Sequence, residues 1–416
     1  LSAVGMGAED GHAVTEAAAR LARETFIRLG PTYVKLGQVI ASARGLLPDP
    51  VVEAFLPCRD EVEPFDPELL PDIIESELGK PPSEIFADLD EKPLAAASVA
   101  QVHAARLRDG REVVVKVLRP GIASLIESDV RLLIRVVYLL YRFWPELEQA
   151  NFHGVLSLFA ETVLEELDLR LEADNMVDLG TGLEALSATD IVVPHPIPGL
   201  VSKNVLVMER LYGRKYSDLS PFERSRYNTP YLLHVAMRTV LEGAAIAGTF
   251  HGDLHSGNVF LLEDGRFGLM DYGIVVRMDD RTRRDLIDLM IAVAKEDTEG
   301  IVDAFAAFGA FPEGVDRSAL LKEVQDTFEA RRARRATREG VQLEDFADGL
   351  SETVRVFARH GGQIPKDLVL FLKNLVYLGE AVRALDPDAD LRAEVGQLFD
   401  YFAGKYTEEM QRLGAL

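Results

Sequence analysis

The chain has 416 residues, which exceeds the usual size of one compact domain and predicts two lobes around substantial cores. Its 68 acidic and 45 basic residues give a formal net charge of −23, and because such a surface repels phosphate backbones, we expect no nucleic-acid partner. The single cysteine, Cys58, excludes an internal disulfide and a multi-cysteine metal site, and it predicts a reducing, cytoplasmic compartment.

The hydrophobic pattern predicts no segment that crosses a membrane. The N-terminus lacks the basic, apolar and cleavage regions of a signal peptide. A spanning helix needs roughly 18 apolar residues in a row, and the nearest candidate, from Leu132 to Trp144, contains Arg135 and Arg142. We therefore expect a soluble chain, with peripheral membrane contact left open.

The first 82 residues are expected to form a helical N-terminal extension. Apolar residues recur at helical spacing from Val14 to Leu29, and a Gly-Pro pair then separates this helix from a second one that carries Tyr33 to Ser42. The acid- and proline-rich stretch from Leu46 to Pro82 indicates a connection, followed by a helix around Pro67 to Leu78.

Residues 83–213 are expected to form a sheet-bearing lobe with inserted helices. Two β-rich runs flank Asp109-Gly110, and Asp-Gly is a frequent hairpin turn. The predicted elements are strands Val99 to Leu107 and Glu112 to Leu118, helices Ile122 to Phe143 and Leu156 to Leu179, and a strand from Lys203 to Met208.

Residues 214–416 are expected to form a mainly helical lobe. A helix runs from Pro230 to about Gly248, two short strands follow at Val259 to Leu262 and Arg266 to Met270, and the pattern beyond Arg281 is helical. The predicted fold class is therefore α+β, with two lobes and a helical extension.

The most specific local signal is the segment from His251 to Asn258, which is followed thirteen residues later by Asp271-Tyr272-Gly273. Phosphoryl transfer needs a carboxylate that orients or deprotonates the acceptor, together with an amide oxygen and a second carboxylate that hold Mg²⁺. Asp253, Asn258 and Asp271 supply these groups in the order and spacing of protein kinases.

Two other interpretations of this segment remain open. Asp253 and His255 could simply cap a turn, where Asp is common. Alternatively, His251, Asp253 and His255 could chelate a transition metal, although this would leave Asn258 and Asp271 without a role.

Lys116 lies among β-branched residues, and a lysine on an apolar strand is costly without an anionic partner. Kinases use a lysine in this context to hold the α- and β-phosphates. The alternative is a solvated lysine on an edge strand.

The run Ala95-Ala96-Ala97-Ser98 lies where a kinase carries its glycine-rich phosphate loop. Since alanine restricts the backbone more than glycine, we expect the nucleotide to be held in an unusual way. A packed helix start is the alternative. Farther along, helical spacing puts Leu164, Leu167 and Leu171 on one stripe, with Glu165, Asp168 and Glu172 beside it.

Together these motifs, with Lys35-Leu36-Gly37-Gln38 and Glu166-Leu167-Asp168, make the chain resemble the UbiB/ADCK family of atypical kinases. The match runs from about Lys35 to Gly273, and the Lys-x-Gly-Gln and alanine-rich elements are the parts specific to that family. Tyr272 departs from the phenylalanine that is usual there.

The resemblance implies ATP and Mg²⁺ as cofactors and a role in isoprenoid lipid or quinone pathways, with a small molecule or lipid as substrate or effector. It implies that Lys35 and Gln38 belong to an extension laid over the active site, that Lys35 lies near Glu166 and Asp168, and that Glu172 pairs with Lys116. The backbone of Met208, Glu209 and Leu211 is expected to bind adenine.

A small acceptor is also indicated by the short stretch between Gly273 and the helical run near Arg281, where a protein kinase carries a long peptide-binding segment. The sequence thus predicts an atypical kinase or ATPase. Two alternatives remain: a nucleotide-binding scaffold that regulates lipid enzymes without turnover, and a metallohydrolase that uses His251, Asp253 and His255.

Overall fold

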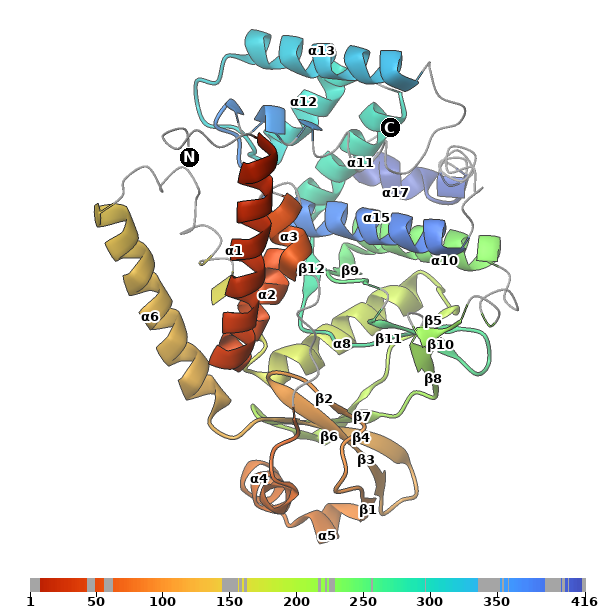
Figure 1. Cartoon of the computed structure of the whole chain (residues 1–416). Helices are drawn as coiled ribbons and strands as arrows, with labels where there is room; N and C mark the ends of the chain where they lie inside the picture. The colour runs from red at the N-terminus through yellow and green to blue at the C-terminus, as the bar shows by residue number, and fades with distance from the viewer. Residues whose placement is uncertain are drawn as a thin grey trace. The chain divides into compact units, whose positions relative to one another are not determined.

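The computed structural model (Figure 1) describes residues 8–42, 49–55, 63–143, 156, 159–160, 163–215, 218–220, 223, 229–255, 257–295, 297–335, 352–353, 355–357, 359–385, 398, 401–402 and 404–413. Cys58 lies outside these residues. The chain divides into two compact units, unit 1 with Leu1–Asp174 and Pro194–Arg210, and unit 2 with Asn175–Val193 and Leu211–Leu416.

Unit 1 begins with three helices, α1 (Ala8–Leu29), α2 (Pro31–Ser42) and α3 (Asp49–Phe55), that pack on one another. Their shared core contains Ala19, Ala54 and the buried ring of Phe55. The predicted first two helices are confirmed, and α1 begins earlier than expected. The prediction missed α3, because seven residues are too few to show a clear helical period.

The sheet of unit 1 has the order β1-β3-β4-β7-β6, and β2 also pairs with β3, at Gln101 and Val102. Its strands are β1 (Phe86–Leu89), β2 (Ala95–Ala96), β3 (Ala100–Leu107), β4 (Glu112–Leu118), β6 (Pro196–Val201) and β7 (Val205–Glu209). The predicted hairpin between β3 and β4 is confirmed. Gly110 has a φ of +90° in its turn, a conformation that favours glycine.

One face of this sheet packs on α4 (Leu70–Leu78), which follows a short 3₁₀ turn, η1 (Pro67–Leu69), and precedes α5 (Pro82–Ile85). Val113, Val115 and Val117 of β4 are completely buried in that core. Because successive side chains of a strand point to opposite faces, Lys116 lies on the other face of the sheet.

Helix α6 (Ile122–Phe143) has the predicted bounds, and the core residues Ile122, Ile126 and Val130 all lie in its first half. The oxygen Oδ2 of Asp129 lies 2.6 Å from the hydroxyl of Thr32 on α2. Among the described helices, none is both long and apolar enough to cross a membrane.

The prediction of one helix from Leu156 to Leu179 is wrong. A turn at Glu166 and Leu167 interrupts it, and α8 (Leu169–Ala185) begins afterwards. Asp168 ends the continuity because its Oδ1 accepts a hydrogen bond from the backbone N–H of Arg170, at 3.1 Å, as a helix N-cap does. The predicted leucine stripe is therefore broken, since Leu171 is 45% exposed while Leu167 is buried.

Unit 2 is mainly helical. Its helices are α10 (Thr229–Glu242), the π-helical turn η4 (Gly243–Ala247), α11 (Asp280–Ala294), α12 (Thr298–Ala307), α13 (Arg317–Arg335), α15 (Lys366–Leu385) and α17 (Thr407–Leu413). Most of these helices share one hydrophobic core, in which the rings of Phe305, Phe311 and Phe357 stack edge to face. The helix predicted after Pro230 and the helical pattern beyond Arg281 are confirmed.

Two small sheets carry the loops of interest in unit 2. The first has the order β5-β11-β10-β8, with β5 (Ile191–Val192), β8 (Gly213–Lys215), β10 (Val259–Leu262) and β11 (Phe267–Leu269). The second pairs β9 (Thr249–His251) with β12 (Val275–Arg277). The predicted hairpin of β10 and β11 is confirmed, so the segments that begin at His251 and Asp271 are fixed by strands on each side.

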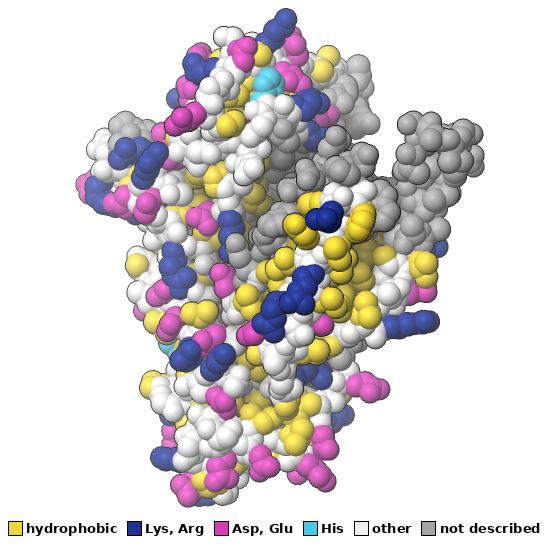
Figure 2. Space-filling model, turned by 90° about the vertical axis from the view of Figure 1, so that its left-hand side faces the viewer, with side chains coloured by type: hydrophobic (Ala, Val, Ile, Leu, Met, Phe, Trp, Pro, Cys, Tyr) yellow, Lys and Arg dark blue, Asp and Glu magenta, His cyan; other side chains and the backbone are white. Residues whose placement is uncertain are grey.

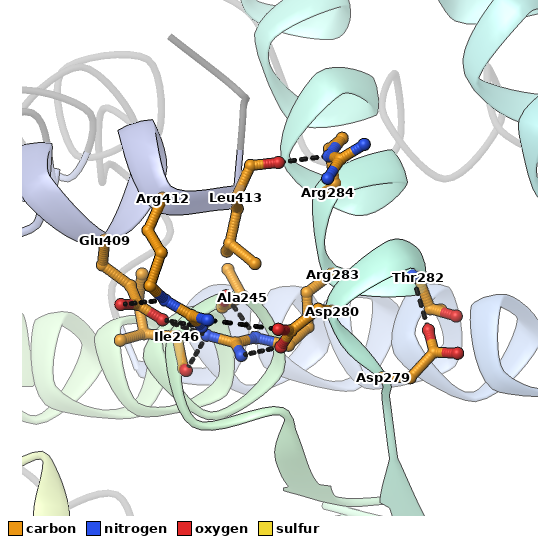
Figure 3. A network of polar contacts seen from close by, with 10 residues as sticks. All are labelled: Ala245, Ile246, Asp279, Asp280, Thr282, Arg283, Arg284, Glu409, Arg412 and Leu413. Carbon is orange, nitrogen blue, oxygen red and sulfur yellow. Dashed lines mark hydrogen bonds and ion pairs between the residues drawn. The ribbon is translucent and has the colours of Figure 1, made fainter.

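The C-terminal helix α17 is bound to α11 by a polar network (Figure 3). The guanidinium of Arg283 lies 2.8 Å from Asp280 and from Glu409, and its Nε donates to the carbonyl oxygen of Ala245 at 3.1 Å. Arg412 reaches the same two carboxylates, at 3.1 Å from Asp280 and 2.7 Å from Glu409. The network therefore joins α17, α11 and η4, the turn that leads into β9.

Candidate active site

Lys116 and Glu172 form a close ion pair in unit 1. The Nζ atom of Lys116 lies 2.7 Å from both carboxylate oxygens of Glu172. The two side chains are 17% and 7% exposed, so the pair is largely removed from water. The interpretation of Lys116 as a solvated lysine is wrong, because β4 is a central strand between β3 and β7.

The N-terminal extension is joined to the segment just before α8. Lys35 of α2 lies 2.7 Å from Oε1 of Glu166, and both side chains are 17% exposed. Asp168 binds Arg170 instead, with its oxygens 2.9 and 2.6 Å from the guanidinium nitrogens. Gln38 is half-buried on α2. The structure thus couples Lys35 to the turn that precedes the helix of Glu172.

The alanine-rich segment is a strand and a tight turn, so the interpretation as a helix start is wrong. Ala95 and Ala96 form β2, opposite Val102 and Gln101 of β3. Ala97 donates its N–H to the carbonyl oxygen of Ala100 at 2.8 Å. The hydroxyl of Ser98 is buried, and it has no hydrogen-bond partner among the described residues.

Met208 and Glu209 end β7, and Leu211 is the first residue of the next stretch of unit 2. Met208 lies opposite Val114 in the sheet. Glu209 donates its backbone N–H to the carbonyl oxygen of His195 at 3.0 Å, and its carboxylate lies 2.9 Å from the ring of the same histidine. The N–H of Glu209 is therefore already used within unit 1.

His251 holds together the two motifs that the sequence predicts to meet. Its Nδ1 accepts the backbone N–H of Asp253 at 3.0 Å, and its Nε2 lies 2.9 Å from the carbonyl oxygen of Asp271. Burial lowers the pKa of His251, so the ring is neutral at physiological pH. The neutral ring accepts at Nδ1 and donates at Nε2, as these two contacts require.

Asn258 closes the same loop. Its Nδ2 donates to the carbonyl oxygen of Asp253 at 3.1 Å, and its own carbonyl oxygen accepts the N–H of Met270 at 2.9 Å. The contacts of the described residues therefore use the amide nitrogen of Asn258 and leave its amide oxygen as the atom that could bind a cation. The predicted trio of Asp253, Asn258 and Asp271 is thus held on one hydrogen-bonded pair of loops.

Asp271 has a φ of +58°, one of two positive values at non-glycine residues in the described chain. Such a backbone costs energy and is common at functional sites. The following residue, Tyr272, is buried and donates its hydroxyl to the carbonyl oxygen of Leu269. Asn175 of α8 donates to the carbonyl oxygen of Tyr272 at 2.8 Å, so the Asp271 loop is fixed on both sides.

The structure argues against the transition-metal interpretation. Both ring nitrogens of His251 contact backbone groups, and Nδ1 of His255 accepts the N–H of Gly257 at 3.0 Å. Over the described part of the chain, no three His, Cys, Asp or Glu side chains gather where they could hold a metal. His255 instead has the turn role that was the open alternative.

Two residues on α15 contact the Asp253 segment, and neither was predicted. The Nζ atom of Lys373 lies 2.9 Å from Oδ1 of Asp253. Asn374 is fully buried, accepts the N–H of Leu254 at 2.9 Å and donates to the carbonyl oxygen of His251. A signal was present, because Lys373-Asn374 interrupts the otherwise apolar run from Leu368 to Leu378.

The segment after Asp271 returns at once to the His251 loop. Val275 of β12 lies opposite His251 of β9, and Gly252 donates its N–H to the carbonyl oxygen of Ile274 at 2.8 Å. Helix α11 then begins at Asp280. The long segment that a protein kinase uses for peptide binding has no counterpart between Gly273 and α11.

The known proteins that this chain is similar to are also kinase-like. A profile of the ABC1 atypical kinase-like domain matches residues 57–305. An uncharacterised aarF domain-containing protein kinase of Arabidopsis thaliana, described as chloroplastic, is 34% identical over 391 residues, which cover 89% of this chain and 72% of that protein. A probable protein kinase UbiB of Aliivibrio fischeri is 32% identical over 382 residues, covering 91% and 69%.

Among solved structures, that of Rv3197 with erythromycin, from Mycobacterium tuberculosis, matches with a TM-score of 0.56 and 23% identity, over 87% of this chain and 90% of the other. At this identity the match concerns the fold alone. The predicted α+β, kinase-like fold, with its sheet in the N-terminal part, is confirmed.

Proposed function

Because the chain belongs to the ABC1 atypical kinase-like family, we propose that it binds ATP with Mg²⁺ and transfers or hydrolyses the γ-phosphoryl group. The observation that carries this proposal is the hydrogen-bonded unit of His251, Asp253, Asn258 and Asp271. It contains the acceptor-orienting carboxylate and two oxygen ligands that suit Mg²⁺.

Lys116 is proposed to contact the α- and β-phosphates of the nucleotide. The carboxylate of Glu172 keeps the ammonium in place on the sheet, with both oxygens at 2.7 Å. The buried hydroxyl of Ser98, which lacks a described partner, is a further donor for phosphate oxygens. We assign the adenine to the backbone near Met208 and Leu211, because the N–H of Glu209 is already bound to His195.

Asp253 is proposed to orient the acceptor and take its proton. The acceptor oxygen forms a bond to the γ-phosphorus, the bond from that phosphorus to the bridging oxygen breaks, and ADP leaves. Asn258 and Asp271 would hold Mg²⁺, which neutralises charge on the phosphate oxygens when it is bound. The neutral ring of His251 contacts the backbone of Asp253 and of Asp271 and so holds the two loops together.

We propose a small molecule or a lipid-pathway component, or water, as the acceptor. The direct return of β12 to β9 supports this, since a peptide substrate needs a longer docking segment. A role in isoprenoid lipid or quinone metabolism follows from the resemblance to UbiB proteins and is part of the same proposal.

The proposal is tested by phosphate release from ATP, with and without Mg²⁺, in wild type, Asp253→Asn and Asp271→Asn. Asn also adopts positive φ readily, so Asp271→Asn keeps the backbone conformation. Asp264→Asn, in the exposed turn between β10 and β11, is the matched control. We expect Mg²⁺-dependent turnover in wild type and control, and loss in both site variants. Nucleotide binding without turnover in wild type would instead indicate a regulatory scaffold.

A further inference from the structure

Helix α15 supplies a cation to the proposed acceptor-orienting carboxylate. Lys373 and Asp253 are separated by more than half of unit 2 in sequence, yet Nζ of Lys373 lies 2.9 Å from Oδ1 of Asp253. The Oδ1 atom is buried, and no described donor is aligned with it for a hydrogen bond, so the contact is mainly electrostatic. Asn374, the next residue, binds the backbone on both sides of Asp253.

Lys373 is charged where it lies. Burial alone lowers its pKa, but Asp253 and Tyr377 outweigh that effect, and the pKa of Lys373 is raised overall. Its ammonium also lies 5.3 Å from the centre of the Tyr377 ring, and that ring contacts His255 edge to face at 6.2 Å. Since the segment from Asp253 to Asn258 contains no lysine or arginine, the local cation comes from α15.

We propose that Lys373 is a positioning residue that holds the Asp253 carboxylate in the orientation that the acceptor requires. This inference rests on the proposed function. The ammonium of Lys373 lies next to Oδ1 of Asp253, so the other carboxylate oxygen of Asp253 is left to take the proton of the acceptor. Asn374 binds the backbone of the same loop, so α15 positions both the backbone and the carboxylate of Asp253.

The test compares Lys373→Met and Lys373→Arg with wild type, using Lys322→Met on the exposed face of α13 as a matched control. We expect Lys373→Met to lower kcat for ATP turnover at least tenfold with an unchanged KM for ATP and an unchanged Mg-ATP thermal shift. Lys373→Arg should restore part of the rate.

A kcat for ATP turnover in Lys373→Met equal to that of wild type would overturn the inference. An equal loss of turnover in Lys373→Arg and Lys373→Met would show a packing role instead. Absence of Mg-ATP turnover in wild type would contradict the proposed function itself. Failure of the inference alone would leave wild-type turnover and the Mg-ATP thermal shift of Lys373→Met intact, so the two failures can be distinguished.

A second, independent feature is an apolar stripe on the outer side of α6. Its residues recur at helical spacing and are between 42% and 66% exposed: Leu125, Leu132, Val136, Leu139 and Phe143. The core-facing residues of the helix lie on another face. Figure 2 shows hydrophobic side chains gathered in a band on this side of the molecule, with Lys or Arg side chains beside them.

The charged residues beside this stripe are positive, whereas the net charge of the whole chain is negative. Arg131, Arg135 and Arg142 share one row next to the stripe. Arg131 lies 3.5 Å from Glu127 one turn earlier, and no acidic residue occurs from Val130 to Phe143. The chain as a whole carries −23. An anionic surface would therefore repel most of the molecule and attract this face.

We infer that α6 lies flat on an anionic lipid surface, with the stripe at the acyl boundary and the arginines at the phosphates. The combination of an apolar stripe and a parallel cationic row is typical of interfacial helices. The stripe runs from Leu125 to Phe143, nineteen residues or about 27 Å at the helical rise, which gives an extended contact. Lipid is favoured over a partner protein because, after Glu127 and Asp129 in the first turns, all the charged residues from Val130 to Phe143 are positive.

The test is co-sedimentation of the protein with phosphatidylcholine vesicles, with and without phosphatidylglycerol, at low and high salt. Wild type should sediment only with the anionic vesicles, and less at high salt. Leu132→Gln with Val136→Gln, or Arg131→Gln with Arg135→Gln, should abolish this. Leu21→Gln on α1, at a residue 66% exposed, should not.

Wild type that stays in the supernatant with anionic vesicles would overturn the inference, as would binding that survives both double variants. Lipid-independent dimers that the same variants dissociate would assign the face to a second copy of the chain instead.

Discussion

The ion pair of Lys116 and Glu172 gives a prediction whose size follows from its burial. Glu172→Gln keeps the size of the side chain but removes the charge opposite the ammonium. Breaking a buried pair by removing one partner costs roughly 3–5 kcal/mol. Because the Lys116 side chain is 17% exposed and glutamine can still accept a hydrogen bond, we expect about 2–3 kcal/mol here.

The assay is thermal unfolding followed by circular dichroism, with Glu75→Gln on the exposed face of α4 as the control. For a unit of this size the midpoint should fall by roughly 4–12 °C in Glu172→Gln. Replacing both residues, Lys116→Met with Glu172→Leu, removes both charges, so the double variant should recover much of the loss. A Glu172→Gln protein with the melting temperature of wild type would refute the reasoning. A double variant that loses as much stability as the two single variants together would also refute it.

Three further predictions concern unit 2. Gly252→Ala should lower both turnover and stability, because a Cβ there would clash with Cγ2 of Ile274, whereas Gly404→Ala, with open space around it, should be neutral in the same melting and rate assays. Asp279→Ala removes the N-cap of α11, whose Oδ1 accepts the N–H of Thr282 at 2.8 Å. It should lower the midpoint of denaturant titrations, and an unchanged midpoint would exclude the cap. Arg412, with Arg283, lowers the pKa of Glu409 from 4.5 to about 2, so its contribution is present above the ordinary pKa and is lost as pH falls toward 2. The difference in amide exchange of α17 between wild type and Glu409→Gln should therefore close over this range, and a constant difference would contradict the ionic contribution.

Local patterns in the sequence predicted the parts of the fold that depend on neighbouring residues. The hairpin of β3 and β4 follows from Asp109-Gly110 between alternating strands, and the bounds of α6 follow from its helical period. The helix through Glu166 was wrong for an equally local reason, because the side chain of Asp168 binds a backbone N–H and starts a new helix.

The candidate site likewise has residues that the sequence predicted and residues that it did not. Asp253, Asn258 and Asp271 were found because their spacing is constrained along the chain, and the contacts through His251 then bring their loops together. Lys373 and Asn374 were missed because they lie about a hundred residues beyond the motif, and only folding of α15 onto the loop relates them. A buried amide inside an apolar helix is the kind of polar interruption that marks such a contact.

Calorimetric titration of ATP, with and without Mg²⁺, into wild type and Asp271→Asn tests the central claim most directly. The account predicts Mg²⁺-dependent binding in wild type that is lost or strongly weakened in Asp271→Asn, whose melting curve stays that of a folded protein. Equal binding in both proteins, or none in folded wild type, would contradict the assignment of these loops to Mg-ATP.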